Sequence, residues 1–166
     1  MMDKIDLQQF CADSGDVRYN IIHPWSDGEY TYATNGHIIV RVGRLPDVEE
    51  NTKAPDAATL FNKTAPPGAW LPVPVAAMPP SFECKECHGT GIFEYAFEGK
   101  EEVEDCEWCG KTGRVRQLLG LRVGGVSFDQ GYLSMIQGWE IAPNGPKLAA
   151  WIRNGDVVGL LMPRNE

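Results

Sequence analysis

The sequence Tyr32-Ala33-Thr34-Asn35-Gly36-His37-Ile38-Ile39-Val40 decides what kind of fold this chain can form. Its Asn-Gly pair stands between two runs rich in β-branched and aromatic residues, which is the strongest short-range signal for a β-hairpin. In the type I′ turn that such a pair predicts, both central residues adopt positive φ. We therefore expect residues 29–34 and 37–42 to form antiparallel strands, with Asn35 and Gly36 at the centre of the turn.

The alternation of apolar and polar residues continues on the N-terminal side of this hairpin. Residues 17–22 alternate, and Pro24 and the polar segment 26–28 end the pattern, so we expect a third strand there. Residues 17–42 are thus predicted to form a three-stranded antiparallel meander. After a polar loop, residues 55–63 begin with a proline, which the first turn of a helix tolerates, and they predict a short helix.

An amphipathic segment precedes the meander. Leu7, Phe10 and Cys11 recur at helical spacing after Asp3 or Asp6, either of which can cap a helix. We expect a short helix that ends at the following Ser-Gly pair. Cys11 lies on the apolar stripe without an activating neighbour, so we expect a small buried hydrophobe rather than a reactive thiol.

The β pattern returns in the C-terminal part of the chain. Further antiparallel strands are predicted at residues 119–123, 126–128 and 132–136, with a turn at residues 129–131. A second Asn-Gly pair, Asn154-Gly155, lies between the runs 149–153 and 156–162. A helix that ends at Gly155 is the alternative, because Leu148, Trp151 and Ile152 have helical spacing. We favour a hairpin, since the second run is typical of a strand.

Four of the five cysteines lie in two Cys-x-x-Cys pairs. Cys84 and Cys87 form the first pair and Cys106 and Cys109 the second, with eighteen residues between the pairs. This spacing is typical of a four-thiolate zinc site, in which each pair supplies two corners of a tetrahedron. We predict one structural Zn2+ and no catalytic role for it, because four thiolates leave no position open for water. A redox-active Cys-x-x-Cys is the less favoured alternative.

The first pair continues as Cys84-Lys85-Glu86-Cys87-His88-Gly89-Thr90-Gly91. This segment resembles the Cys-x-x-Cys-x-Gly-x-Gly repeat in the cysteine-rich zinc domain of J-domain chaperones. In the second pair the glycine stands one place earlier, at Gly110, and Lys111 follows it. Glycines here let backbone amides turn toward the sulfurs, so we expect two zinc knuckles, the second with a slightly different turn. Residues 91–95 and 113–116 are expected to pair as a small β-ribbon.

Two side chains near these cysteines are candidates for contact with a partner. Trp108 lies inside the second pair, where an exposed aromatic ring can stack on a base or enter a partner's pocket; packing against the sheet is the alternative. His88 directly follows a ligand, and we expect it to serve in a turn rather than at the metal. Residues 98–107 are strongly acidic and predict either a solvated loop or a surface for a basic partner.

The composition of the chain changes before the cysteines. Six prolines accumulate between Ala65 and Pro80, which indicates an extended segment that leads out of the β-rich part. We therefore divide the chain into a body, residues 1–78 and 117–166, and an insert, residues 79–116, that binds the zinc.

The body resembles the bacterial sliding clamp, the ring-shaped processivity subunit of the replicative polymerase. Residues 32–40 are similar to its Ala-Thr-Asp-Gly-His-Arg-Leu-Ala stretch, with Asn35 for the aspartate and Ile38 for the arginine. Residues 159–164 look like the closing Met-Pro strand of the clamp. The resemblance implies an α+β fold, a single clamp-like domain in which two helices line one face of a curved antiparallel sheet. A clamp subunit resembles three such domains in a row, so a homo-oligomer of this chain stays an open alternative.

Length and charge limit the class of protein. The chain has 166 residues, of which 43% are hydrophobic, and a formal net charge of -8. Such a chain suits one domain with an embellishment, and its acidity disfavours nonspecific binding to nucleic acid. We find neither a signal-peptide pattern nor an apolar run that could cross a membrane. We therefore expect a cytoplasmic protein, whose paired cysteines bind metal rather than form disulfides.

The sequence favours a binding protein. It contains no recognisable nucleophile motif, nucleotide fingerprint or carboxylate pair, so we expect no enzyme. Our first hypothesis is a zinc-binding accessory or regulatory module with a protein partner, in DNA replication or in a phage. The alternative is a small regulatory protein that docks on a protein or an RNA through the insert.

Overall fold

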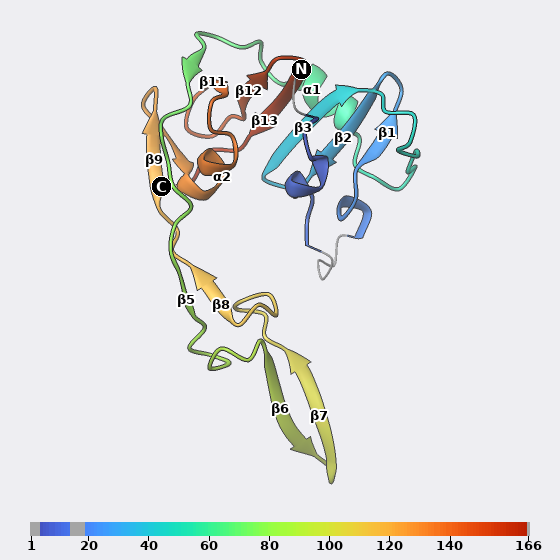
Figure 1. Ribbon diagram of the computed structural model, residues 1–166, viewed down its shortest axis with the longest axis vertical. Helices are drawn as coiled ribbons and strands as arrows, with labels where there is room; N and C mark the ends of the chain where they lie inside the picture. Colours follow the sequence, from blue (N-terminus) through green and yellow to red (C-terminus); the bar gives the residue numbers. More distant parts are fainter. Residues whose placement is uncertain (1–3, 14–18, 166) are drawn as a thin grey trace.

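The computed structural model describes residues 4–13 and 19–165 and has an α+β fold (Figure 1). Its body contains a seven-stranded antiparallel sheet with the strand order β1-β2-β3-β13-β12-β11-β4. In this order the strands are Trp25–Asp27, Tyr30–Thr34, Ile38–Gly43, Val157–Leu161, Ala150–Asn154, Glu140–Ala142 and Leu71–Pro72. The predicted fold class, an antiparallel sheet with short helices, is therefore confirmed.

The sheet consists of two similar halves that meet at β3 and β13. The meander β1-β2-β3 forms one half and β11-β12-β13 the other, and they join through antiparallel pairing of Val40 with Gly159. A short helical segment comes before each meander in the chain, namely η1 (Leu7–Phe10) and α2 (Gln130–Met135). The sequence shows no repeat here apart from the two Asn-Gly pairs, so the twofold arrangement becomes visible only in the structure.

Apolar layers cover both faces of the sheet. Leu7 and Phe10 of η1 and Leu133 of α2 pack on one face, in a core that includes Val40 and Ile152. On the other face, helix α1 (Ala57–Lys63) buries its Ala57 and Phe61 in a second cluster, together with Trp25, Tyr32, Ile39 and Leu160. The two helices expected to share a face therefore lie on opposite faces, because successive residues of a strand point to opposite sides.

Both Asn-Gly hairpins are present, although their turns differ from the expected type. Thr34 pairs with Ile39 and Asn154 with Val157, so glycine is the first central residue of each turn and not the second. Within these two turns, only Gly36 and Gly155 have positive φ, 94° and 57°, as at the first central position of a type II′ turn. Asn35 instead caps the turn, since its Oδ1 accepts from the backbone N–H of His37 at 2.9 Å.

Two strand predictions are wrong. The strand predicted at residues 17–22 is not formed, because residues 19–21 form the 3-10 turn η2 (Tyr19–Ile21) and the outer strand begins only at Trp25. The predicted start of that strand at Val17, and the Ser-Gly pair predicted to end the first helix, lie outside the described residues. Residues 130–135 form helix α2 and no strand. Asp129 begins this helix, because its side chain accepts from the backbone N–H of Gly131 at 2.7 Å, and burial of Leu133 and Ile136 outweighs the β propensity of the segment.

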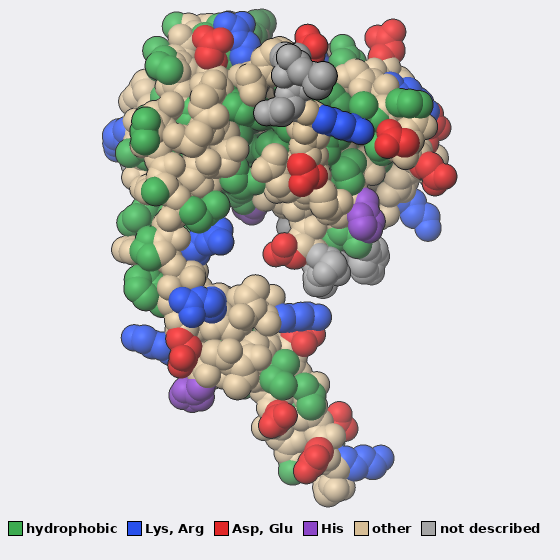
Figure 2. Space-filling model, in the orientation of Figure 1, with side chains coloured by type: hydrophobic (Ala, Val, Ile, Leu, Met, Phe, Trp, Pro, Cys, Tyr) green, Lys and Arg blue, Asp and Glu red, His purple; other side chains and the backbone are tan. Residues whose placement is uncertain are grey.

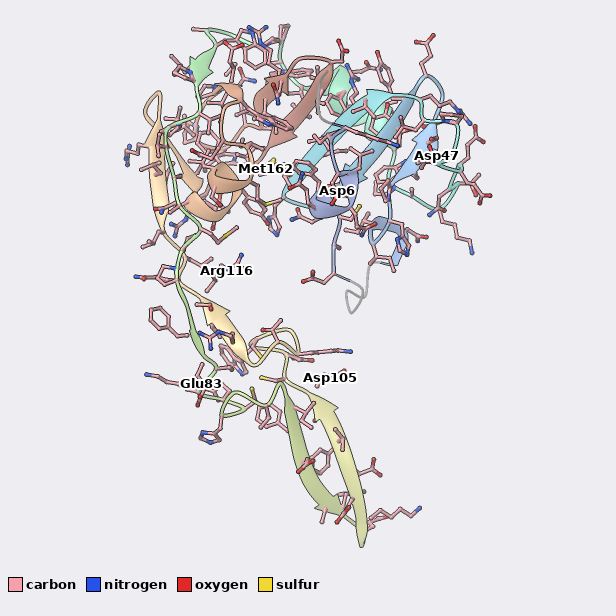
Figure 3. All side chains as sticks on the ribbon, viewed as in Figure 1. Asp6, Asp47, Glu83, Asp105, Arg116 and Met162 are labelled. Atoms are coloured by element: carbon pink, nitrogen blue, oxygen red, sulfur yellow. The ribbon has the colours of Figure 1, made fainter. Side chains whose placement is uncertain are left out.

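The remaining strands form the ribbon beside α2 and the insert. Strands β9 (Gly120–Val123) and β10 (Val126–Asp129) pair as a ribbon of the body. The insert extends away from the body in Figure 1 and contains β5 (Ser81–Glu83), β6 (Ile92–Phe97), β7 (Lys100–Asp105) and β8 (Arg114–Arg116). Glu83 and Asp105 mark it in Figure 3, whereas Asp6, Asp47 and Met162 lie in the body. The chain enters and leaves the insert at one point, where the N–H of Gln117 donates to the carbonyl of Pro80 at 3.1 Å.

Candidate metal centre

The four paired cysteines converge on one point within the insert, between the strand pair β5–β8 and the strand pair β6–β7. Their sulfur atoms all lie within 4.8 Å of one another. Across the two pairs, the Sγ atoms of Cys84 and Cys106 are 3.9 Å apart, and those of Cys87 and Cys109 are 3.7 Å apart. Three of the cysteines are buried and Cys109 is half-buried. This group can hold a metal ion, as their spacing predicted; four thiol groups are a ligand set for a soft divalent cation.

The two knuckles, residues 84–91 and 106–113, have the same turn despite their different glycines. In the first, His88 and Gly89 have φ of 52° and 79°. In the second, Gly110 and Lys111 have φ of 59° and 70°. Each turn thus has two successive residues in the left-handed region, and each supplies one glycine and one residue with a side chain. The expected difference between the two turns is not found.

Backbone amides point at two of the sulfurs, as the glycine pattern predicted. The N–H of Gly91 donates to the Sγ of Cys87, and that of Gly113 to the Sγ of Cys109, each at 3.2 Å. Such bonds spread the negative charge of metal-bound thiolates. Both glycines also lie where the knuckles touch, because a Cβ on Gly91 would meet the carbonyl oxygen of Lys111.

Further hydrogen bonds connect the knuckles to each other in a symmetric pair. The N–H of Cys84 donates to the carbonyl of Gly113 at 2.8 Å, and the N–H of Cys106 donates to that of Gly91 at 2.9 Å. These bonds hold the first cysteine of each pair against the last glycine of the other. The protein itself therefore brings the two halves of the site together.

Burial and hydrogen bonding shift the pKa of two thiols in opposite directions. Burial raises the pKa of Cys106 to about 11. Burial also acts to raise the pKa of Cys87, but the N–H of Gly91 and the neighbouring cysteines outweigh it and bring that pKa to about 6. The cluster thus stabilises a thiolate at Cys87. A metal ion would remove the remaining protons, since thiolates are the form that binds metal.

The predicted β-ribbon of the insert is paired differently. Residues 91–95 and 113–116 do not pair with each other. Strand β6 pairs with β7 from Ile92 and Asp105 to Phe97 and Lys100, and β8 pairs with β5. Each knuckle lies between two strands that belong to different ribbons, so the cysteine cluster is the junction of the two.

The two predicted contact residues of the insert are both exposed. Trp108 is 75% exposed, so it does not pack against the body sheet. His88 is exposed and takes part in the knuckle turn, as its positive φ shows. Neither side chain belongs to the group of four ligands.

The body carries an apolar groove that the sequence analysis did not identify. It encloses about 680 Å³ between α1 and the strands β3 and β13. Gly36 to Ile39 and Met162 line it from the sheet, and Ala57 and Leu60 line it from the helix. The N–H of Met162 donates to the carbonyl of His37 at 3.0 Å. The segments 32–40 and 159–164 therefore lie side by side on one groove, and no short pattern in the sequence predicted it.

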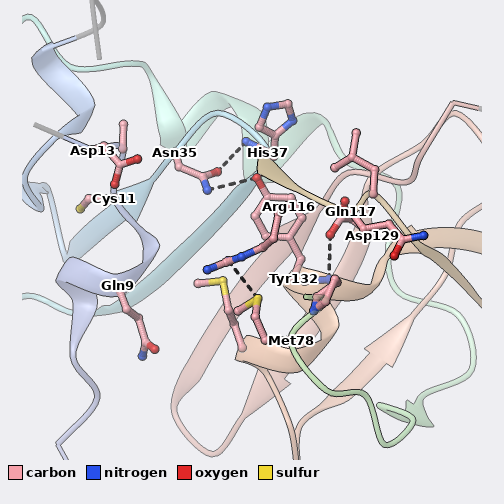
Figure 4. Close-up of a pocket in the computed structure, with 15 residues that line it drawn as sticks. Gln9, Cys11, Asp13, Asn35, His37, Met78, Arg116, Gln117, Asp129 and Tyr132 are labelled. Carbon is pink, nitrogen blue, oxygen red and sulfur yellow. Dashed lines mark hydrogen bonds between the residues drawn. The ribbon is translucent and has the colours of Figure 1, made fainter. Parts of the chain in front are cut away.

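A second cavity, of about 450 Å³, lies where the insert joins the body (Figure 4). Asn35, His37 and Tyr132 line its body side, and Met78 and Arg116 line it near the insert. The side-chain amide of Asn35 donates to the hydroxyl of Tyr132 at 3.3 Å, and Arg116 donates to the sulfur of Met78 at 3.0 Å. This cavity is more polar than the groove and contains no cluster of metal ligands among its described residues.

Comparison with protein-family models, with curated proteins and with solved structures found no match for this chain. Among the described residues, no helix is long and apolar enough to span a membrane. The cysteine cluster, the groove and the surface of the insert are the features of the structure that bear on function.

Proposed function

We propose that this protein is a zinc-binding accessory module, in which a clamp-like body binds an apolar segment of a partner protein and a structural zinc ion holds the insert. DNA replication, in a bacterium or a phage, is the context that the clamp resemblance suggests. Zinc is the metal we propose because four thiolates with paired amide hydrogen bonds favour a closed tetrahedral site.

The observation that carries the binding role is the convergence of two distant motifs on the groove. The segments 32–40 and 159–164 are far apart in the sequence and lie next to each other in the sheet. The groove between them and α1 presents Leu60 and Met162, which are 46% and 45% exposed. Apolar grooves with a few polar groups at the rim are the usual binding sites for short peptides, and Lys53 and Asp56 supply such groups here.

The metal is tested by analysis of the purified protein. We expect one zinc ion per chain, and Cys84→Ser or Cys109→Ser should abolish its binding, whereas Cys11→Ala should leave it unchanged because Cys11 lies outside the cluster. A protein purified under reducing conditions with no zinc, or with iron in its place, would contradict the zinc proposal.

The groove is tested with a panel of overlapping peptides from a bacterial replicative polymerase. We expect one or more peptides with apolar side chains to bind the full chain, and the variants Leu60→Glu and Met162→Glu to weaken that binding at least tenfold, because a carboxylate in an apolar groove loses its hydration. Leu148→Glu is the matched control, since Leu148 is 55% exposed outside the groove. Equal loss in all three variants, or no binding peptide, would count against the groove.

Homo-oligomerisation is tested on the same preparation. Small-angle scattering over a range of concentrations distinguishes a monomer from a ring. A ring would extend the clamp resemblance from the fold of one domain to its assembly, and a monomer at every concentration would restrict the proposal to an accessory protein that binds as one copy.

A second candidate function places the partner on the insert. The exposed indole of Trp108 favours it, since a large aromatic ring in solvent is typical of a contact residue. Deletion of residues 82–116 separates the two candidates, and the deletion can be closed with a short glycine linker because Pro80 and Gln117 are hydrogen-bonded neighbours. A deleted protein that still binds its partner excludes this second candidate.

A further inference from the structure

The hairpin of β6 and β7 carries a row of aromatic side chains on one face. Phe93, Tyr95 and Phe97 alternate along β6, so they point to the same side. They are 36%, 48% and 62% exposed. Alternate residues of a strand are about 7 Å apart, so the three rings form a continuous line along the hairpin.

Acidic side chains lie beside this row on the same face. The register pairs Phe93 with Glu104 and Tyr95 with Glu102, and directly opposed residues have Cβ atoms about 5 Å apart. Lys100 is opposite Phe97. We define the aromatic face by these six residues. Figure 2 shows hydrophobic and acidic side chains next to each other on the hairpin.

Stability of the insert does not explain the aromatic face. The buried cluster of the insert contains cysteines alone among the described residues, and the rings of β6 pack in neither core of the body. An isolated two-stranded hairpin has no second layer to cover such rings. Exposed apolar rows with a polar rim are typical of interaction surfaces.

The charge of the hairpin restricts what can cover this face. Residues 92–105 contain six carboxylates and one lysine. Nucleic acid is therefore repelled, and a second copy of a chain with a net charge of -8 is repelled as well. Arginine and lysine fit both features of the face, because their cations pair with carboxylates and also stack on aromatic rings.

We propose that the aromatic face of the β6–β7 hairpin binds an arginine-rich extended segment of a partner protein. The guanidinium groups lie over the rings of Phe93, Tyr95 and Phe97 and pair with Glu102 and Glu104. This inference deepens the second candidate function, because it names the surface on the insert and the chemistry of its partner. It depends neither on the groove nor on Trp108.

The test uses the full zinc-loaded chain and a labelled peptide with arginine at alternate positions and serine between. Fluorescence anisotropy should detect binding that weakens as the salt concentration rises from about 50 to about 200 mM, since exposed charges are screened. The double variant Tyr95→Ser, Phe97→Ser should weaken binding about tenfold, because two of the three rings that contact the cations are removed. Glu102→Gln with Glu104→Gln should weaken it about fivefold.

The matched control removes the same number of carboxylates from the opposite face of the hairpin. Glu94→Gln with Glu101→Gln removes two carboxylates that point away from the rings, and binding should fall by no more than about twofold. Zinc content, measured for every variant, shows that the metal centre is intact. Equal losses in the two glutamine variants would overturn the proposal, because they would indicate attraction by charge alone.

Other outcomes distinguish the proposal from binding through Trp108, from binding of nucleic acid and from dimerisation. If Trp108→Ala abolishes peptide binding and the hairpin variants retain it, the insert binds its partner through the knuckle and the proposal falls. Binding of a short oligothymidylate through the same rings, or dimerisation that the ring variants remove, would also overturn it. No binding of the arginine peptide by the wild-type chain would overturn it, whatever the result for the groove.

Discussion

The body and the insert are held together by different means. In the body, apolar clusters lie on both faces of the sheet, and side chains such as Phe10, Phe128 and Ile152 are completely buried. In the insert, the buried cluster consists of cysteines, and the large apolar side chains are exposed. A segment of this size cannot build a sufficient core from its own residues. Apolar burial therefore stabilises the body, whereas the insert depends on its cysteine cluster and on the metal ion that we propose it binds.

Metal removal should separate the two regions most clearly. A structural zinc site contributes about 10–16 kcal/mol to folding of its domain, so a strong chelator or Cys84→Ser should unfold residues 84–113. In a 1H–15N spectrum, the amide signals of the insert should collapse to random-coil positions while those of the sheet remain. Simultaneous loss of the sheet signals would show that the two regions are not independent.

A cavity in the core of the body should destabilise the body and leave the metal site of the insert intact. Phe128 is fully buried in the core of the body, and Phe128→Ala should cost about 3–5 kcal/mol of unfolding free energy through lost burial and the residual cavity. The melting temperature of the body should fall, and the zinc content of the folded protein should stay at the wild-type level. Exposed Phe97 provides the control, since Phe97→Ala should leave the melting temperature nearly unchanged.

A methyl group at the contact between the knuckles should weaken the metal site without loss of a ligand. In Gly91→Ala the added Cβ meets the carbonyl of Lys111 in a residue with φ of 79°. The N–H bond to Cys87 should lengthen, and we expect metal affinity to fall about 10–100-fold. Competition with a chromogenic chelator measures it. Gly99→Ala is the control, because Gly99 has a φ of 76° but open space around it.

A smaller, pH-dependent effect should be confined to the body. Burial raises the pKa of Cys11 to about 11, whereas the thiol of an unfolded chain has a pKa of about 8.5. Between these two values the unfolded state has lost the proton and the native state retains it, so stability falls as pH rises. At pH 10 this loss is about 2 kcal/mol, and Cys11→Ala should remove it. Denaturant titrations at pH 8 and pH 10 provide the comparison; an identical slope in the variant would contradict the assignment to Cys11.

Short sequence patterns predicted the parts of the structure that are determined by residues close together in the chain. The two hairpins, helix α1, the burial of Cys11 and the convergence of four cysteines all follow from short patterns. The details of the turns do not, because an Asn-Gly pair fits two registers that differ by one residue. At Gly36 the side chain of Asn35 decides between them, since it accepts two backbone N–H groups.

Long-range packing explains what the sequence did not predict. Residues 130–135 have the composition of a strand, but a helix there lets Leu133 and Ile136 enter the core beside η1. The pairing of β3 with β13 joins the two parts of the body that the insert separates in the sequence, and no local pattern encodes it or the groove beside it. In the insert, the prediction paired residues 91–95 with the wrong strand. Strand β6 pairs with β7 through a short turn at Glu98 and Gly99, and residues 91–95 alone do not reveal that turn.

The strand pairs β6–β7 and β3–β13 differ in how far apart their strands lie in the sequence, and this difference sets the order in which they form. Strands β6 and β7 are neighbours in the chain, and a hairpin of this kind forms in about 1–10 μs, which brings both cysteine pairs together. The central pairing of the body joins Val40 to Gly159 across the entire insert, and such distant contacts form slowly. During synthesis the insert leaves the ribosome before β13 has been made. The four cysteines can therefore be in place while the body still lacks its central strand pair, and the newly made chain carries a complete ligand set on an open sheet.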